Sequence, residues 1–274
     1  IDMNIERILS HKKIDKEYEI VKEMEDTITD IYKKNSENDI LDNLSLLYEV
    51  EEKNKYNINL FNKLDGIVDL SDPDTSMPNS LHALQTAEAM RKDDKPEWMI
   101  LTGLIHDMGK IIYTIGCSED GTSIDTQWSI VGDTFITGTR LPDDLVLSEY
   151  NEYNLDHNNN INKYVDNCGL DECSVSFGHD EYLYRLLKYN NHKLPLEAEY
   201  MIRYHSLYAW HSGTSYDYLE NDIDKQLKSW VKDFNKYDLY TKDDDNQVEW
   251  TEDLREYYTD LVRKYISCDL IINY

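Results

Sequence analysis

Leu104-Ile105-His106-Asp107-Met108-Gly109-Lys110 is the stretch that decides the fold. Apolar residues recur at helical spacing from Glu97 onward, so we expect a helix that runs through Met108. Adjacent residues on a helix point about 100° apart, and His106 and Asp107 can therefore serve one or two metal ions from the same turn. A His-Asp dipeptide alone is weak evidence, because it can also be an ordinary hydrogen-bonded pair.

The sequence around that stretch also favours helices. Only 10 glycines and 5 prolines punctuate the 274 residues. Further helices are predicted over residues 79–92, 180–189, 195–208, 223–239 and 252–265. We expect Asn79 or Ser80 to cap the first of these helices, and Pro195 to take the first position of the helix over 195–208.

The remaining segments predict loops and a helical N-terminal arm. Residues 116–138 are rich in Gly, Thr and Asp and predict a long loop with a short hairpin centred on Trp128–Val131. Residues 143–167 predict an Asn- and Asp-rich surface insertion. The first sixty residues predict two or three helices without chemical signals. Since no linker separates these parts, we expect one compact domain, with an arm over 1–60 and a core over 61–274.

Charge and apolar content restrict the partners. The chain has 28 basic and 55 acidic residues and a formal net charge of −27, which repels phosphate backbones and anionic membrane surfaces. No apolar run approaches the roughly 20 residues that span a bilayer, and we see no secretory-type start. The four cysteines form no CxxC pair and fit reduced thiols. We therefore expect a cytoplasmic monomer that acts on a small molecule, with no nucleic-acid or membrane partner.

Several histidines and aspartates lie on inward faces of the predicted helices. His82 and His205 share faces with core-like residues, and Asp238 lies on an apolar stripe with Phe234 and Val231. Each histidine taken singly is read more simply as a hydrogen-bonded core residue. A buried, unpaired carboxylate, however, is destabilising by several kcal/mol and calls for a cation.

Taken together, four histidines and two aspartates on separate helices favour a shared metal site. Six ligands are too many for one catalytic ion with open positions, and they suit two ions bridged by the carboxylate beside His106. Ligation by nitrogen and oxygen without thiolate suits Fe, Mn, Zn or Mg and disfavours structural zinc.

The order of these residues resembles the ligand order of dinuclear HD-domain proteins. Within that superfamily the chain resembles the myo-inositol oxygenase family from about residue 61 to 265, with an interruption near 141–165. The segments that carry the resemblance are residues 67–74 (IVDLSDPD), 78–88 (PNSLHALQTAE), 104–110 (LIHDMGK), 127–135 (QWSIVGDTF), 178–182 (GHDEY), 200–206 (YMIRYHS) and 234–242 (FNKYDLYTK). The sequence departs from the family pattern at Leu70, where an acid is usual, and at Ile136-Thr137.

The resemblance implies an all-α, HD-domain-like helical bundle and a non-haem diiron oxygenase without an organic cofactor. It implies that two iron ions, mixed-valent Fe(II)/Fe(III), are held by His82, His106, Asp107, His179, His205 and Asp238. The implied reaction is the O2-dependent, four-electron ring cleavage of myo-inositol to D-glucuronate.

The resemblance also implies a substrate pocket. Its residues are implied to be Asp69, Leu70, Ser71, Lys110, Gly132, Asp133, His205, Ser206 and Lys242. Lys110, one turn beyond His106, is expected to act in catalysis by stabilising an oxygen of the metal-bound substrate. Without a metal site it would be read as a solvated lysine at a helix end.

Two other functions remain open at this point. The first is a metal-dependent phosphohydrolase of the same superfamily, in which two ions activate water; the acidic net charge argues against it. The second is a binding protein that keeps the helical fold without turnover.

Overall fold

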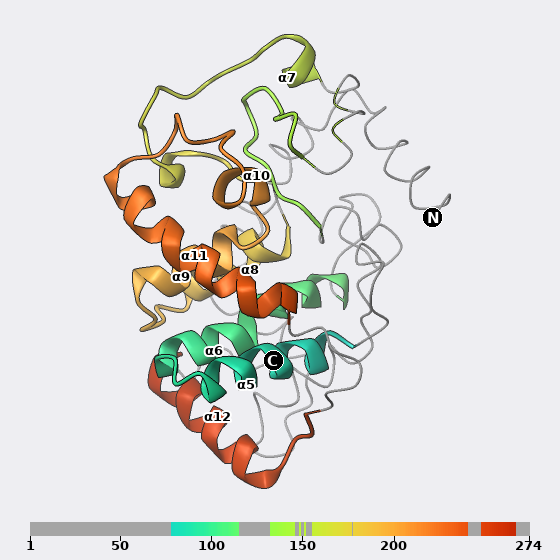
Figure 1. Cartoon of the computed structure of the whole chain (residues 1–274), viewed down its shortest axis with the longest axis vertical. Helices are drawn as coiled ribbons and strands as arrows, with labels where there is room; N and C mark the ends of the chain where they lie inside the picture. The colour runs from blue at the N-terminus through green and yellow to red at the C-terminus, as the bar shows by residue number, and fades with distance from the viewer. Residues whose placement is uncertain are drawn as a thin grey trace.

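The computed structural model describes residues 78–114, 132–145, 148, 151, 155–176, 178–240 and 248–266. In order, the helices are α5 (Asn79–Lys92), α6 (Glu97–Ile105), the 3₁₀ helix η1 (His106–Thr114), α7 (Leu155–Asn158), the 3₁₀ turn η4 (Leu170–Glu172), α8 (His179–Tyr189), α9 (Leu196–Tyr204), α10 (Tyr208–His211), α11 (Asp222–Tyr240) and α12 (Glu252–Tyr265) (Figure 1). The described part of the chain contains no strand beyond two isolated bridges. The all-α prediction is confirmed. The arm over residues 1–60 and the hairpin at Trp128–Val131 lie outside the described residues.

α5 and α6 both follow a proline and pack closely against one another. Pro78 and Pro96 precede them, and neither provides a side-chain cap. The expectation that Asn79 or Ser80 caps the first helix is therefore wrong, because both residues lie inside α5 and are buried. Gly103 of α6 faces α5, and a Cβ atom there would meet the Sδ of Met90 at 3.0 Å and the Cα of Ala87 at an ordinary contact distance of 3.4 Å.

The α-helix that carries the His-Asp pair ends earlier than predicted. α6 stops at Ile105, and the chain continues as the tighter helix η1 from His106 to Thr114 instead of remaining α-helical through Met108. A 3₁₀ helix has 3.0 residues per turn, so residues three apart lie one above the other. Asp107 and Lys110 are three apart and are thereby stacked on one side of η1.

The helix before His205 is also shorter than predicted. α9 ends at Tyr204 instead of residue 208, and the backbone N–H of His205 still donates to the carbonyl of Met201 at 3.1 Å. Pro195 lies just before α9 and not inside it. The chain turns after His205 and resumes as α10.

The other predicted helices are confirmed within one residue. α8 and α11 each begin one residue earlier than expected, and α12 has the predicted bounds. Thr251 caps α12, its hydroxyl accepting from the N–H of Leu254 at 3.2 Å.

Two apolar clusters surround the region where the histidines meet. One lies among α5, α6, α8, α9 and α12 and includes Leu84, Leu101 and Met201. The other packs Trp210, Tyr204 and neighbours against residues 136–175. The bridge Ile136–Val175 joins the two ends of that segment, and the bridge Thr139–Asn162 pairs residues within it. The Asn158 to Asn160 run is exposed, as expected of a surface insertion.

Candidate metal centre

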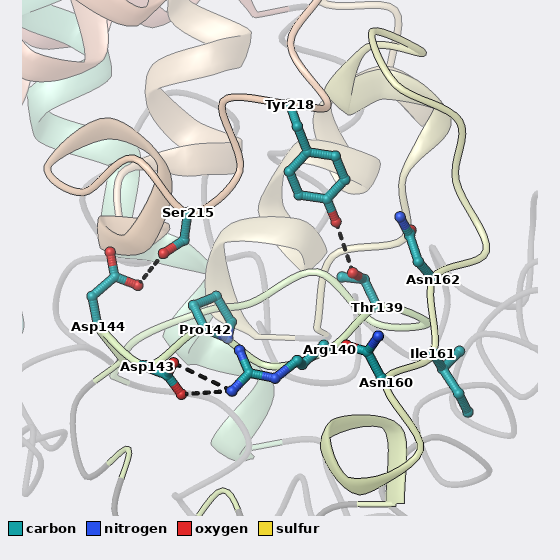
Figure 2. A pocket seen from close by; sticks show the side chains of 10 residues that line it. All are labelled: Thr139, Arg140, Pro142, Asp143, Asp144, Asn160, Ile161, Asn162, Ser215 and Tyr218. Carbon is teal, nitrogen blue, oxygen red and sulfur yellow. Dashed lines mark hydrogen bonds and ion pairs between the residues drawn. The ribbon is translucent and has the colours of Figure 1, made fainter.

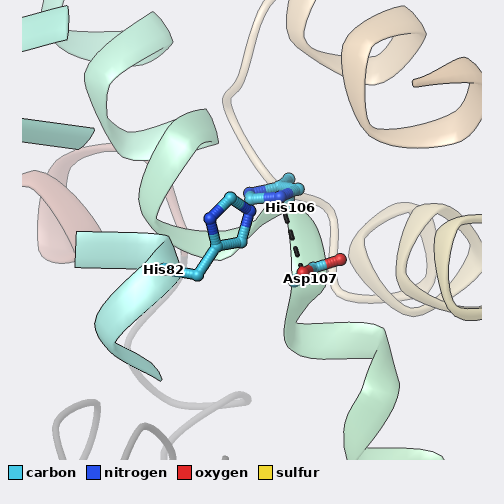
Figure 3. Close-up of side chains that lie close together, drawn as sticks. All are labelled: His82, His106 and Asp107. Carbon is cyan, nitrogen blue, oxygen red and sulfur yellow. Dashed lines mark ion pairs between the residues drawn. The ribbon is translucent and has the colours of Figure 1, made fainter. Parts of the chain in front are cut away.

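The six residues expected to bind metal come from five elements and converge on one buried region. His82 lies on α5, His106 and Asp107 open η1, His179 is the first residue of α8, His205 follows α9, and Asp238 lies in the last turn of α11. All six are buried. Figure 3 shows three of them: the imidazole of His82 lies beside that of His106, and a dashed line joins His106 to Asp107.

The carboxylate of Asp238 contacts the imidazoles of two of the histidines. Its Oδ1 lies 2.9 Å from Nε2 of His82 and 3.2 Å from Nε2 of His106. Nε2 of His106 also lies 3.6 Å from Oδ2 of Asp107. These four side chains form one half of the centre.

The carboxylate of Asp107 lies beside the imidazoles of the other two histidines. Its Oδ1 lies 3.2 Å from Nε2 of His179 and 3.9 Å from Nε2 of His205. The two Nε2 atoms are 3.0 Å from each other. Two imidazole nitrogens at that separation require a proton or a cation between them, because two lone pairs would repel.

Backbone carbonyls fix the orientation of two of the rings. Nδ1 of His106 donates to the carbonyl of Gly103 at 2.8 Å, and Nδ1 of His205 donates to that of Ile202 at 2.9 Å. With its hydrogen on Nδ1, each ring presents Nε2 to the centre. Metal-binding histidines are oriented in the same way by a partner on the second nitrogen.

Burial and mutual charge set the ionisation of the centre. Burial opposes charge on Asp107, but Lys110, His106 and His179 hold the pKa of its carboxyl well below the ordinary value. Burial also opposes charge on Asp238, and His106 and His82 lower its pKa likewise. Burial, together with the charges of His179 and His106, lowers the pKa of His205 to about 3. The centre thus holds two anionic carboxylates beside a neutral imidazole.

These donors fit metal ions. Two groups of three have ligand atoms close enough to share an ion: His82, His106 and Asp107, and Asp107, His179 and His205. Asp107 belongs to both groups. Its two oxygens face different histidines, which is the arrangement that a carboxylate bridging two ions requires.

Comparison with known proteins identifies the family of this chain. A family model described as "Myo-inositol oxygenase" matches residues 21–274. The chain belongs to the myo-inositol oxygenase family.

Proteins named "Inositol oxygenase" are similar over most of the chain. The protein from Sus scrofa is 43% identical over 210 residues, which cover 74% of this chain and 71% of that protein. The protein from Homo sapiens is 44% identical over 210 residues, covering 74% and 70%. The protein from Dictyostelium discoideum is 41% identical over 215 residues, covering 76% and 71%.

Lys110 lies inside the centre of this family member. Its side chain is buried, and Nζ donates to Oδ2 of Asp107 at 2.8 Å and to Oδ1 of Asn79 at 3.2 Å. The alternative of a solvated lysine is therefore wrong.

Part of the predicted substrate pocket lies beside the histidines. The N–H of Thr134 donates to the carbonyl of Ser206 at 2.9 Å, which places the segment with Gly132 and Asp133 next to His205. Gly132 has a φ of 88°, a backbone conformation suited to glycine. Asp69, Leu70, Ser71 and Lys242 lie outside the described residues, so their roles remain predictions.

Sequence reasoning missed three residues that support this centre. Nδ2 of Asn235 and Nε2 of His211 both donate to the carbonyl of His205, at 3.1 and 2.9 Å. Asn79, expected only as a helix cap, instead accepts from Lys110. Asn235 could have been found, because it precedes Asp238 by three residues and therefore shares its helix face.

A separate surface pocket of about 580 Å³ lies away from the six residues (Figure 2). Six of its polar side chains are hydrogen-bonded in pairs: Arg140 to Asp143, Ser215 to Asp144, and Tyr218 to Thr139. No residue of the candidate metal centre lines it.

Among the helices that the structure describes, none has the length and apolar content needed to cross a membrane.

Proposed function

We propose that this chain is an inositol oxygenase that uses O2 to cleave the ring of myo-inositol to D-glucuronate at two iron ions. One observation carries the proposal: Asp107 is shared by two groups of potential ligands, in a chain that matches the myo-inositol oxygenase family over residues 21–274. The oxidation removes four electrons from the substrate and needs no organic cofactor.

The six proposed ligands fall into two groups, one for each iron ion. His82, His106 and Asp238 would hold one iron, His179 and His205 would hold the other, and Asp107, which belongs to both groups of potential ligands, would be shared between them. When bound, the irons act as Lewis acids toward the substrate oxygens and supply the redox chemistry for O2. Because His205 stays neutral at physiological pH, its Nε2 lone pair needs no deprotonation before it binds metal.

Lys110 provides positive charge where the substrate loses a proton. Its ammonium group is held by Asp107 and Asn79 in a buried environment, where electrostatic interactions are stronger than in water. It stabilises the negative oxygen of the substrate and acts as the catalytic residue among this chain's own side chains.

The substrate hydroxyls are bound by residues around this lysine. Gly132, Asp133, His205 and Ser206 are the proposed pocket residues that lie among the described ones. The sequence resemblance assigns the rest of the pocket to Asp69, Leu70, Ser71 and Lys242, which lie outside the described residues. A neutral polyol is insensitive to the acidic charge of the chain, and we propose that the enzyme works as a cytoplasmic monomer without nucleic-acid or membrane partners.

The test measures O2 uptake by iron-loaded protein supplied with myo-inositol, beside an anaerobic assay for phosphate release from nucleotides and phosphate esters. We expect inositol-dependent O2 uptake with stoichiometric glucuronate and no phosphate. Anaerobic phosphate release without O2 uptake would instead favour the phosphohydrolase. A fully loaded protein that binds myo-inositol without turnover would favour the binding protein.

A further inference from the structure

A buried ion pair joins α8 to α9. Nε of Arg203 donates to Oε2 of Glu181 at 2.6 Å, and its Nη2 donates to Oε1 at 3.3 Å. The side chains of Arg203 and Glu181 are only 7% and 1% exposed. Two donors of one guanidinium on one carboxylate fix both the distance and the angle between the groups.

Neighbouring side chains restrict Arg203 further. Its Nη1 donates to Oδ1 of Asp171 at 2.9 Å and to the hydroxyl of Tyr204 at 3.0 Å. The guanidinium carbon lies 4.5 Å from the ring centre of Tyr184 and 5.2 Å from that of Tyr204. The guanidinium is thus held by hydrogen bonds in its plane and by contacts with aromatic rings.

Each partner of the ion pair lies two residues from a histidine of the candidate metal centre. Glu181 follows His179 in the first turn of α8, and Arg203 precedes His205 at the end of α9. The two helices are therefore joined at two nearby points. One is the ion pair, and the other is the pair of Nε2 atoms 3.0 Å apart.

We propose that Glu181 and Arg203 are positioning residues that set the spacing of His179 and His205 for the metal ion these histidines share. This inference rests on the proposed diiron function. Two histidines from different helices form a metal site only if those helices keep a fixed spacing, and a bidentate ion pair restricts that spacing more tightly than apolar contacts, which have no direction.

The experiment compares Arg203→Lys and Glu181→Gln with the unaltered protein. Lysine keeps the charge of Arg203 but cannot make the bidentate contact. After anaerobic loading, we measure iron per chain, the rate at which a chelator withdraws each iron well below the melting temperature, and the melting temperature of the iron-free protein. We expect one of the two irons to leave roughly ten to a hundred times faster, the size of the loss in metal affinity when a side chain that orients a metal ligand is replaced.

Arg185→Lys is the matched control. Nε of Arg185 donates to Oε1 of the same Glu181 at 2.7 Å, but both residues belong to α8 and the contact does not cross to α9. Iron release from this control should match that of the unaltered protein. If the Arg203 and Glu181 variants melt at a lower temperature but release iron as slowly as the unaltered protein, the ion pair only stabilises the fold and the positioning role is overturned.

If neither buried variant folds, Asp171→Asn replaces them, because the Asp171 side chain is 56% exposed and still contacts Arg203. A smaller acceleration of iron release supports the proposal, and an unchanged rate overturns it. The unaltered protein separates the two levels of inference. If it binds fewer than two irons, the proposed function fails and the positioning role fails with it; if it binds two, the variants test the positioning role alone.

Discussion

Nζ of Lys110 lies 2.8 Å from Oδ2 of Asp107, and both side chains are almost fully buried. The 3₁₀ winding of η1 produces this contact, because residues three apart are stacked along such a helix. One oxygen of Asp107 therefore meets a lysine while the other meets His179 and His205. The same carboxylate links the candidate metal ligands to the proposed catalytic ammonium group.

Replacement of Lys110 should separate catalysis from metal binding. Lys110→Met keeps most of the volume of the side chain and removes its charge. We expect turnover of myo-inositol to fall by a factor of about 10²–10³, the usual effect of losing one electrostatic contact to a developing negative charge. Iron content should change little, because Lys110 contacts Asp107 without belonging to the ligand set.

The control for that variant is Lys236→Met, since the side chain of Lys236 is exposed and pairs only with Asp233 among the described ion pairs. It should behave as the unaltered protein. Near-normal turnover by Lys110→Met would remove the lysine from the catalytic machinery.

Replacement of Asp107 should affect both metal ions, whereas replacement of Asp238 should affect one. Asp107 contacts histidines from both halves of the centre, whereas the ion pairs that Asp238 makes within the described part of the chain join it to His82 and His106. We expect Asp107→Ala to lose most of both irons and Asp238→Ala to lose about one, measured as iron per chain after anaerobic loading. Full dinuclear occupancy in Asp107→Ala would mean that Asp107 is not a bridging ligand.

The sequence predicted which six side chains converge, and most helices, because both leave local signals; that these side chains bind metal stays a prediction. Apolar periodicity placed α8, α11 and α12 within one residue. The order of histidines and aspartates pointed to a dinuclear site. The contacts that orient the centre are non-local, as when Asn79 meets Lys110 across 31 positions and Arg203 meets Glu181 across 22. No pattern within a helix indicates such pairings.

The two misplaced helix ends have a common cause. Apolar spacing continues past Ile105 and past Tyr204, so periodicity alone extends both helices. In the structure, the backbone N–H groups of His106 and His205 make the last α-helical hydrogen bonds of their helices, at the point where each histidine turns toward the centre. Tertiary packing, including the contacts around His106 and His205, overrides the local preference there.

The buried imidazole of His192, outside the metal centre, should make the stability of the fold depend on pH. Nδ1 of its ring accepts from the N–H of Leu194 at 3.1 Å, which requires the unprotonated nitrogen, and its side chain is only 4% exposed. Burial lowers the pKa of His192, although Glu199 opposes this. As the pH falls below about 6.5, the unfolded chain takes up a proton that the folded chain does not, so folding becomes less favourable.

We therefore expect His192→Gln to lose less stability than the unaltered protein between pH 7.5 and pH 5.5. Urea unfolding of the two iron-free proteins at both pH values measures the difference. Equal losses in the two proteins would show that His192 does not contribute to the acid sensitivity.

Gly109 lies where η1 approaches α8 so closely that a side chain would not fit. A Cβ atom at residue 109 would lie 1.8 Å from the carbonyl oxygen of His179, a backbone atom that cannot move alone. Gly109→Ala should therefore push η1 away from the start of α8 and weaken iron binding through His179. It should also lower the free energy of unfolding by about 3 kcal/mol, at the upper end of the usual range for overpacking.

Gly103→Ala is the matched control. Its new Cβ atom would meet the flexible end of Met90 at 3.0 Å, and alanine is favoured by about 0.5–1 kcal/mol inside a helix, so stability should change little. Urea unfolding and iron content are measured for both variants. If Gly109→Ala were as stable as Gly103→Ala and bound as much iron, the close approach of η1 to α8 would not be what positions His179.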